Sequence, residues 1–246
     1  YGDWFNQRDD SYSRFLRMDG KKTEEMAIFK NFSLGVFTSR DAWAYGSNHK
    51  QVFDNMQKSI NFYNQQVDEA SRLGEKFSPN LDPFKMKWDR PQKKNVRRGR
   101  RAEFANRICI NKSYYRPFFP QFLYFDRFWN NCVYQMPSIF PMNTSNNLVI
   151  CSSGVDNRII CINQNAKDAG QIALMINHIA DLHFNGDTQC FPRWLPGEQA
   201  KKTEDVLDFG EPNEVPSGFS PEALPHFQAA YPGMPMTEDD LFYYIY

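Results

Sequence analysis

Apolar residues recur every three or four positions between Ser47 and Gly74, which is typical of one face of an α-helix. Polar residues such as Gln57 and Asn61 fill the other face. Ser47 or Asn48 can cap the start, and Gly74 stands where helices commonly end. The pattern predicts one long amphipathic helix, and we expect a helical connector over residues 1–84. The apolar positions are Val52, Met56, Ile60, Tyr63, Val67 and Ala70.

The stretch from 74 to 101 has no such periodicity. Pro79, Pro83, Pro91 and Gly99 interrupt it, and each of these residue types tends to break a long regular element. We therefore predict a loop.

Short runs rich in Ile, Val, Phe and Tyr follow, separated by turn residues, as in β-strands. The runs are RICINKSYY (107–115), QFLYF (121–125), NLVICSS (147–153) and RIICIN (158–163). SSGVDNR (152–158) predicts a hairpin connection between the last two. Periodicity does not separate strand from helix for residues 170–184. We expect a strand-rich mixed domain over residues 85–196.

From Pro192 the chain is rich in proline and acidic residues, which is typical of a wrapped or mobile connector and not of a core element. Two short helices are predicted near its end. One covers SPEALPHFQAAY (220–231), and the other starts at Thr237, with Asp240 three residues later as an acidic variant of the capping box. The fold class expected for the whole chain is α+β, with an acidic connector and C-terminal helices over residues 197–246.

Charge is unevenly distributed, although the formal net charge of the 246 residues is zero. From Lys85 to Arg101 there are nine Lys or Arg and one Asp, whereas from Glu198 onward there are ten Asp or Glu and two Lys. Such asymmetry between segments indicates that the surface carries a separate basic region, although the chain as a whole is neutral. No apolar run approaches the length of a membrane span, and the first residues do not resemble a signal peptide. We expect a cytoplasmic protein with no membrane partner.

Motifs of catalysis and of metal binding were sought and not found in the sequence. There is no phosphate-binding glycine loop and no nucleophile elbow. His178 and His183 flank Asp181, but their spacing suits neither a zinc helix nor a strand, so structural histidines are the better interpretation. The five cysteines are scattered along the chain and form no C-x-x-C motif. This favours buried thiols in a reducing compartment. We predict no catalytic residue and no metal site.

The basic run is the first candidate for binding a partner. Clustered cations repel one another, and phosphates would relieve that repulsion with release of counterions. The alternative is a solvated surface loop. The candidates for contact with a DNA backbone are Lys93, Lys94, Arg97, Arg98, Arg100 and Arg101.

An aromatic run follows, with nine rings between Tyr114 and Asn131. Rings in such segments are usually buried, so the run is interpreted as core that supports neighbouring loops. Stacking on unpaired bases is the alternative.

Five segments, in this order, resemble the C-terminal region of Type ISP restriction-modification enzymes. They are DWFNQRDDSYSRF (3–15), IFKNFSLGVFTSRDAWAYG (28–46), YYRPFFPQFLYFD (114–126), MPSIFP (136–141) and MTEDDLFYYIY (236–246). Those enzymes join a nuclease, a helicase-like motor, an adenine methyltransferase and a target recognition domain in one chain. The resemblance runs nearly end to end and implies that this chain is a piece of such a protein.

The resemblance implies a non-catalytic module that reads a short sequence of double-stranded DNA, with its target recognition domain at 85–196. The methyltransferase and helicase domains of the same chain would be its other partners. This module needs no cofactor, whereas the parent enzyme would use S-adenosylmethionine, ATP and Mg. Asn and Gln suit adenine and Arg suits guanine. The possible base-reading residues, each of which could instead cap a loop, are Asn130, Asn131, Gln135, Asn143, Asn146, Asn147, Asp156, Asn157 and Arg158.

Two further points stay open from the sequence. Arg40 and Asp41 either form a buried pair that fixes the long helix, or Arg40 faces the DNA; Ser39 and Gly46–Ser47 depart from the family's form of this segment. The rival functions are a protein-interaction module that couples motor and methyltransferase, and a fragment of an enzyme site completed elsewhere.

Overall fold

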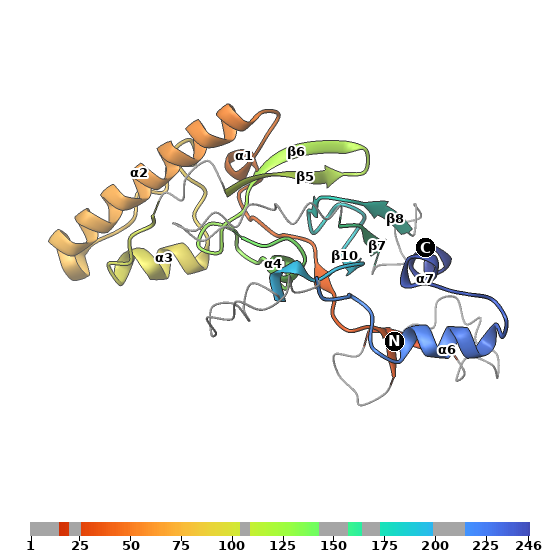
Figure 1. Ribbon diagram of the computed structural model, residues 1–246. Helices are drawn as coiled ribbons and strands as arrows, with labels where there is room; N and C mark the ends of the chain where they lie inside the picture. Colours follow the sequence, from red (N-terminus) through yellow and green to blue (C-terminus); the bar gives the residue numbers. More distant parts are fainter. Residues whose placement is uncertain (1–14, 20–25, 104–108, 143–156, 164–172, 199–214) are drawn as a thin grey trace, which may run out of the picture.

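The computed structural model describes residues 15–19, 26–103, 109–142, 157–163, 173–198 and 215–246. Helices α2 (His49–Leu73) and α3 (Arg90–Arg97) lie at one end of the molecule, and helices α6 (Ala223–Ala230) and α7 (Glu238–Ile245) lie toward the other (Figure 1). The β-sheets lie between these two pairs of helices. This mixture of helices and sheets confirms the α+β class.

One four-stranded sheet contains most of the predicted strand region. Its order is β4 (Tyr45–Gly46), β6 (Phe119–Tyr124), β5 (Ile110–Arg116) and β9 (Ile179–Ala180). β5 and β6 form an antiparallel hairpin, and β9 runs parallel to β5. The predicted strands at 107–115 and 121–125 are therefore confirmed.

A second four-stranded sheet is antiparallel throughout. Its order is β3 (Ser33–Leu34), β10 (Thr188–Pro192), β7 (Ile159–Asn163) and β8 (Ala173–Ile176). β7 confirms the strand predicted at 158–163, and the described part of the ambiguous segment 170–184 contains two short strands, β8 and β9, and no helix. The strand predicted at 147–153 and most of the hairpin predicted at 152–158 lie outside the described residues.

Helix α2 confirms the prediction from periodicity. The Asn48 side chain accepts a hydrogen bond from the backbone N–H of Gln51 at 2.9 Å, and Gly74 follows the last turn with a φ of 54°. A positive φ favours glycine, which explains why the helix ends there. The six predicted apolar positions of its inner face are all buried.

The helical prediction for the chain before α2 is wrong over the described residues. This segment forms β1 (Arg17–Asp19), β2 (Ala27–Phe29), β3 and β4, with one short helix, α1 (Asp41–Ala44). β3 pairs with β10, and β4 pairs with β6. Pairing with strands more than seventy residues away determines the conformations of β3 and β4, and local periodicity carries no information about such partners.

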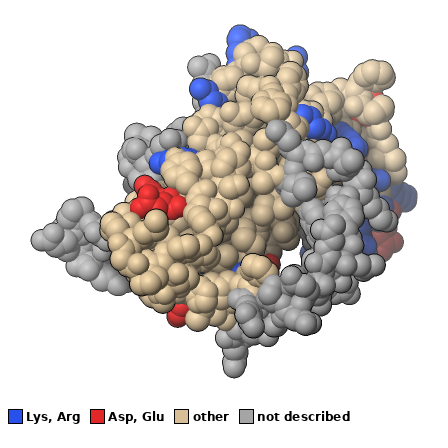
Figure 2. Space-filling model, turned by 90° about the vertical axis from the view of Figure 1, so that its right-hand side faces the viewer, with Lys and Arg blue, Asp and Glu red and all other residues tan. Residues whose placement is uncertain are grey.

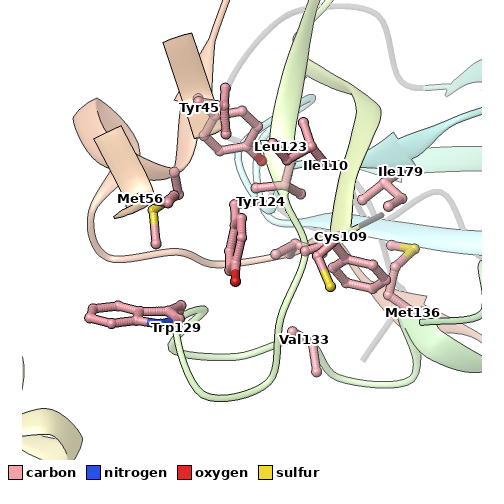
Figure 3. Close-up of a cluster of buried hydrophobic side chains, with 14 of the residues drawn as sticks. Tyr45, Met56, Cys109, Ile110, Leu123, Tyr124, Trp129, Val133, Met136 and Ile179 are labelled. Carbon is pink, nitrogen blue, oxygen red and sulfur yellow. The ribbon is translucent and has the colours of Figure 1, made fainter. Parts of the chain in front are cut away.

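Two hydrophobic cores cross the predicted boundaries at 84 and 196. The larger core includes Met56 of α2, Tyr124 of β6 and Trp129, which are turned toward one another and fully buried (Figure 3). The smaller core joins Ile28 of β2, which lies within the connector predicted over 1–84, to residues of β7, β10, α6 and α7. The aromatic run is largely core, as predicted, although Phe118 and Phe119 at the β5–β6 turn are exposed.

The two C-terminal helices were both predicted, and α7 begins with the predicted capping box of Thr237 and Asp240. The acidic first turn of α7 has its own cationic partner. Arg193 binds Glu238 at 2.8 Å and Asp239 at 2.6 Å. The described acidic residues of α7 therefore do not pair with the basic run.

Candidate nucleic-acid interface

Helix α3 carries the middle of the basic run, so the prediction of a loop is wrong over residues 90–97. Asp89 caps the helix, since its Oδ1 accepts a hydrogen bond from the N–H of Gln92 at 3.0 Å. Pro91 lies in the first turn, where its fixed φ fits a helix and its missing N–H leaves no intrahelical bond unmade. Proline here helps to start a helix, whereas the sequence analysis took it as a break.

The helix has one buried and one exposed side. Gln92 and Val96 are buried against the rest of the protein, and Lys93, Lys94 and Arg97 are exposed. Lys94 and Arg97 lie in the last turn, where the helix dipole favours cations. The fold thus presents the predicted backbone-binding residues to solvent on a regular scaffold.

The segment after α3 is held to helix α2 by polar bonds. The Tyr63 hydroxyl donates to the Arg100 carbonyl oxygen at 2.7 Å, and burial raises the pKa of Tyr63 to about 12, so the phenol remains a donor at neutral pH. Asn64 makes two bonds with the backbone of Ala102, one to its carbonyl oxygen and one from its N–H, each of 2.9 Å. Arg100 therefore has a fixed backbone position.

Replacing Asn64 by alanine should lower the free energy of unfolding by about 1–2 kcal/mol, because two backbone bonds are lost at a half-buried site. Urea denaturation of the chain measures this effect. The matched control is Asn61→Ala on the exposed side of the same helix, for which we expect a change within about 0.5 kcal/mol. Equal effects of the two substitutions would show that Asn64 does not hold the basic segment.

Most of the basic residues have no acidic partner. Among the described residues, Arg101 forms an ion pair with Asp68, whereas Lys93, Lys94, Arg97 and Arg98 form none. Figure 2 shows the side of the molecule that faces away from α3, where Lys and Arg side chains lie in separate small groups, some of them next to acidic side chains. The uncompensated positive charge expected from the sequence is therefore present on the surface.

A cavity of about 310 Å³ opens beside this basic segment, between α3 and the turn at 126–131. It brings Arg100 of the predicted backbone-binding set together with Asn130 and Asn131 of the predicted base-reading set. The sequence analysis missed Asn95 and Arg127, although Arg127 stands three residues before Asn130. The lining residues are Pro91, Gln92, Asn95, Arg100, Asp126, Arg127, Phe128, Asn130 and Asn131.

The turn that forms one wall is closed by its own side chains. Asp126 Oδ1 accepts the N–H groups of Phe128 at 2.8 Å and Trp129 at 3.0 Å, and Asn130 Oδ1 accepts the N–H of Asp126 at 2.8 Å. Burial raises the pKa of Asp126, against the opposite effect of those two N–H groups. Asn130 is 3% exposed, and its Nδ2 is buried without a hydrogen-bond partner. Asn131 makes no hydrogen bond within the described part of the chain and is half-buried.

Arg40 forms hydrogen bonds with both walls of the cavity. Its guanidinium donates to Asp89 at 2.5 Å, to Gln92 at 2.7 Å and to the carbonyl oxygen of Trp129. Arg40 is 1% exposed, so it does not face a DNA cleft. The structural role predicted for Arg40 is correct, but its acidic partner is Asp89 and not Asp41. Asp41 instead accepts hydrogen bonds from the Thr38 hydroxyl and, at 3.0 Å, from the Tyr115 hydroxyl.

The other predicted base-reading residues lie elsewhere. Gln135 is exposed before α4 (Met136–Ile139). Asn157 is 5% exposed, and its amide bonds to the backbone of Ile139 and Trp194. Arg158 donates to the Tyr243 hydroxyl and lies over that ring. The internal contacts of Asn157 and Arg158 serve the packing of the protein. Asn143, Asn146, Asn147 and Asp156 lie outside the described residues.

Asp181, the acidic residue between the two histidines considered for a metal site, is bonded to other side chains of the protein. Asp181, between His178 and His183, accepts hydrogen bonds from Tyr45 at 3.0 Å and Arg116 at 2.9 Å. Burial raises the pKa of Asp181. No group of three His, Cys, Asp or Glu residues suited to a metal occurs among the described residues, and no helix in that part of the chain is long and apolar enough to cross a membrane.

Comparison with known proteins adds the family. The model of the Type ISP C-terminal specificity domain matches residues 27–246. The chain belongs to this family. No curated protein matches the chain, but the chain is similar to solved structures of proteins in complex with DNA.

One such structure is a DrdV–DNA complex, with 25% identity and a TM-score of 0.72, which covers 99% of this chain and 22% of that one. Another is a nuclease-deletion mutant of the Type ISP restriction-modification enzyme LlaGI in complex with a DNA substrate mimic. It is 24% identical, the TM-score is 0.68, and the match covers 89% of this chain and 19% of LlaGI. A third is the ATP-dependent Type ISP restriction-modification enzyme LlaBIII bound to DNA. It is 24% identical, the TM-score is 0.70, and the match covers 100% of this chain and 14% of LlaBIII. The chain thus spans less than a quarter of the length of these proteins.

Proposed function

We propose that this specificity domain recognises a particular sequence of double-stranded DNA and holds the duplex with its basic segment. The observation that carries the proposal is the row of exposed, unpaired cations on and after α3, which adjoins a concave site lined with amide side chains. Phosphate contacts set the register of a protein on DNA, and side chains that reach base edges choose the sequence. The similar structures named as DNA complexes support this assignment.

The proposed backbone-binding residues are Lys93, Lys94, Arg97, Arg98 and Arg100. Arg101 takes a lesser part, because Asp68 already compensates its charge. The proposed base-reading residues are Gln135, which is exposed and has no internal bond among the described residues, together with Asn143, Asn146, Asn147 and Asp156. Asn130 and Asn131 are left out of this set because they line the cavity beside the basic segment. Asn157 and Arg158 are removed from the set because of their internal contacts.

The finer part of the proposal concerns the parent protein. Bound DNA would be placed so that a methyltransferase domain can turn an adenine out of the helix and methylate its N6 with S-adenosylmethionine. A motor that uses ATP and Mg and a nuclease would act on the same DNA. This domain supplies position and sequence choice, and it takes no chemical part.

Duplex binding by the chain over a series of salt concentrations tests the proposal. If all five unpaired cations contact phosphates, the logarithm of the binding constant should fall with the logarithm of salt concentration with a slope of about −4 to −5. Selection from random duplexes should yield one motif. Binding without sequence preference would refute the recognition role, and no binding at low salt would refute the whole proposal.

A second candidate function is a coupling module that contacts the motor or methyltransferase without reading bases. The exposed rings of the C-terminal helices favour it: Tyr243 is 50% exposed, Tyr244 58% and Tyr246 51%. Exposed aromatic groups that gather on one surface often mark contacts between proteins. This function predicts negligible DNA affinity, so the same salt series separates the two.

A further inference from the structure

The cavity between α3 and the 126–131 turn is preformed, because buried bonds join its two walls. Gln92 Nε2 donates to the carbonyl oxygen of Phe128 at 2.9 Å, and Gln92 Oε1 accepts from Arg40, which also binds Trp129. These bonds connect α3 directly to the turn. A cavity fixed in this way can select a ligand group by position as well as by charge.

Positive charge borders this cavity from both sides. Arg100 comes from the segment after α3, and Arg127 comes from the turn; both are exposed, and neither forms an ion pair among the described residues. The Arg100 guanidinium lies 5.9 Å from the centre of the Phe128 ring, which restricts its position. Asp126 is the one acidic lining residue, and its carboxylate accepts two N–H groups of the turn. The rim therefore favours an anion.

Hydrogen-bond donors remain available in the cavity lining. Asn130 has a buried Nδ2 with no acceptor, which is unusual because buried polar atoms are nearly always bonded. Asn131 beside it uses neither side-chain atom within the described residues. An acceptor oxygen brought by a ligand would satisfy the Asn131 amide directly, and it would satisfy Asn130 Nδ2 once that side chain turns toward the cavity.

We propose that this cavity binds a single phosphate of the DNA backbone and thereby fixes the register of the duplex on the domain. Arginines from two sides and amide donors form the set that recognises a phosphodiester oxygen. The cations on the outer side of α3 act differently, since they attract the backbone without choosing one phosphate. This inference rests on the proposed DNA-binding function. It names the residues that fix the register of the bound duplex on the domain.

Phosphate replacement in the selected duplex tests the inference. Each phosphate in turn is changed to an uncharged methylphosphonate, and the affinity of the 246-residue chain is measured. At one position the change should weaken binding roughly 10- to 100-fold, the effect of losing a charged hydrogen-bonded contact. In the double variant Arg100→Gln and Arg127→Gln, the same position should show no additional loss.

The matched control is Arg97→Gln with Arg98→Gln, which removes two exposed cations that do not line the cavity. This control should weaken binding but keep the sensitive position. A uniform small loss at all positions, or a sensitive position that persists without Arg100 and Arg127, would overturn the inference while leaving DNA recognition intact. Absence of DNA binding by the unaltered chain would overturn both.

Discussion

Replacing Arg40 by methionine should lower the free energy of unfolding of the chain by about 3–5 kcal/mol, the cost of removing one partner from a buried ion pair. Arg40 is 1% exposed, and its partner Asp89 is also largely shielded, with a side chain 14% exposed. Methionine preserves much of the volume but leaves the Asp89 carboxylate, Gln92 Oε1 and the Trp129 carbonyl oxygen without their donor. Burial lowers the pKa of Arg40, and the neighbouring Asp89 carboxylate opposes that shift.

Urea denaturation gives the loss of stability, and hydrogen exchange over residues 87–97 and 126–131 locates it. Lys50→Met is the control, because Lys50 forms an exposed ion pair with Asp54 and should change stability by less than about 0.5 kcal/mol. If Arg40→Met is as mild as this control, the network does not hold the two cavity walls together.

This prediction depends on a contact that sequence reasoning could not find. Arg40 and Asp89 are 49 residues apart, and the nearer candidate, Asp41, lies next to Arg40 in the chain. Side chains of adjacent residues on a helix point in different directions, so an adjacent acid is a poor partner. Only the fold, which brings the residue before α1 next to the start of α3, reveals which carboxylate Arg40 meets.

Elements with a strong local signal were predictable. Helix α2 has a complete apolar face and a recognisable cap at each end, and the capping box of α7 needs only four residues. β3 and β4 have two residues each and depend on distant strands, so no local pattern could identify them. Helix α3 was missed for another reason: its proline is in the first turn, where it is compatible with a helix.

The candidate site was predictable in kind but not in arrangement. The charge of the basic run was evident from composition, and the run is indeed exposed. Which amides accompany it depends on folding, because Asn130 and Asn131 reach the cavity through a turn that Asp126 closes. Asn157 has the same side chain but is used inside the protein. Residue type alone does not distinguish these cases.

Reversing the charge of Arg97, Arg98 and Arg100 to glutamate should nearly abolish DNA binding by the chain. Each substitution removes a cation that could contact phosphate and adds a repulsive charge at the same place. We expect affinity to fall by about 10³-fold or more at moderate salt and the salt slope to become shallower by about 3, if all three contact phosphates. Arg101 is left unchanged, since its charge is already paired with Asp68.

The matched control for this reversal is Lys58→Glu, Arg72→Glu and Lys76→Glu. These cations are exposed on α2 and the short helix η3 (Gly74–Lys76), and the substitutions change the net charge by the same amount. A circular dichroism spectrum like that of the unaltered chain checks folding in both variants. Position, not total charge, is what the proposed interface requires, so the control should retain most of its affinity. If both triple variants lose affinity equally, the partner responds only to overall charge, and α3 has no special part in binding DNA.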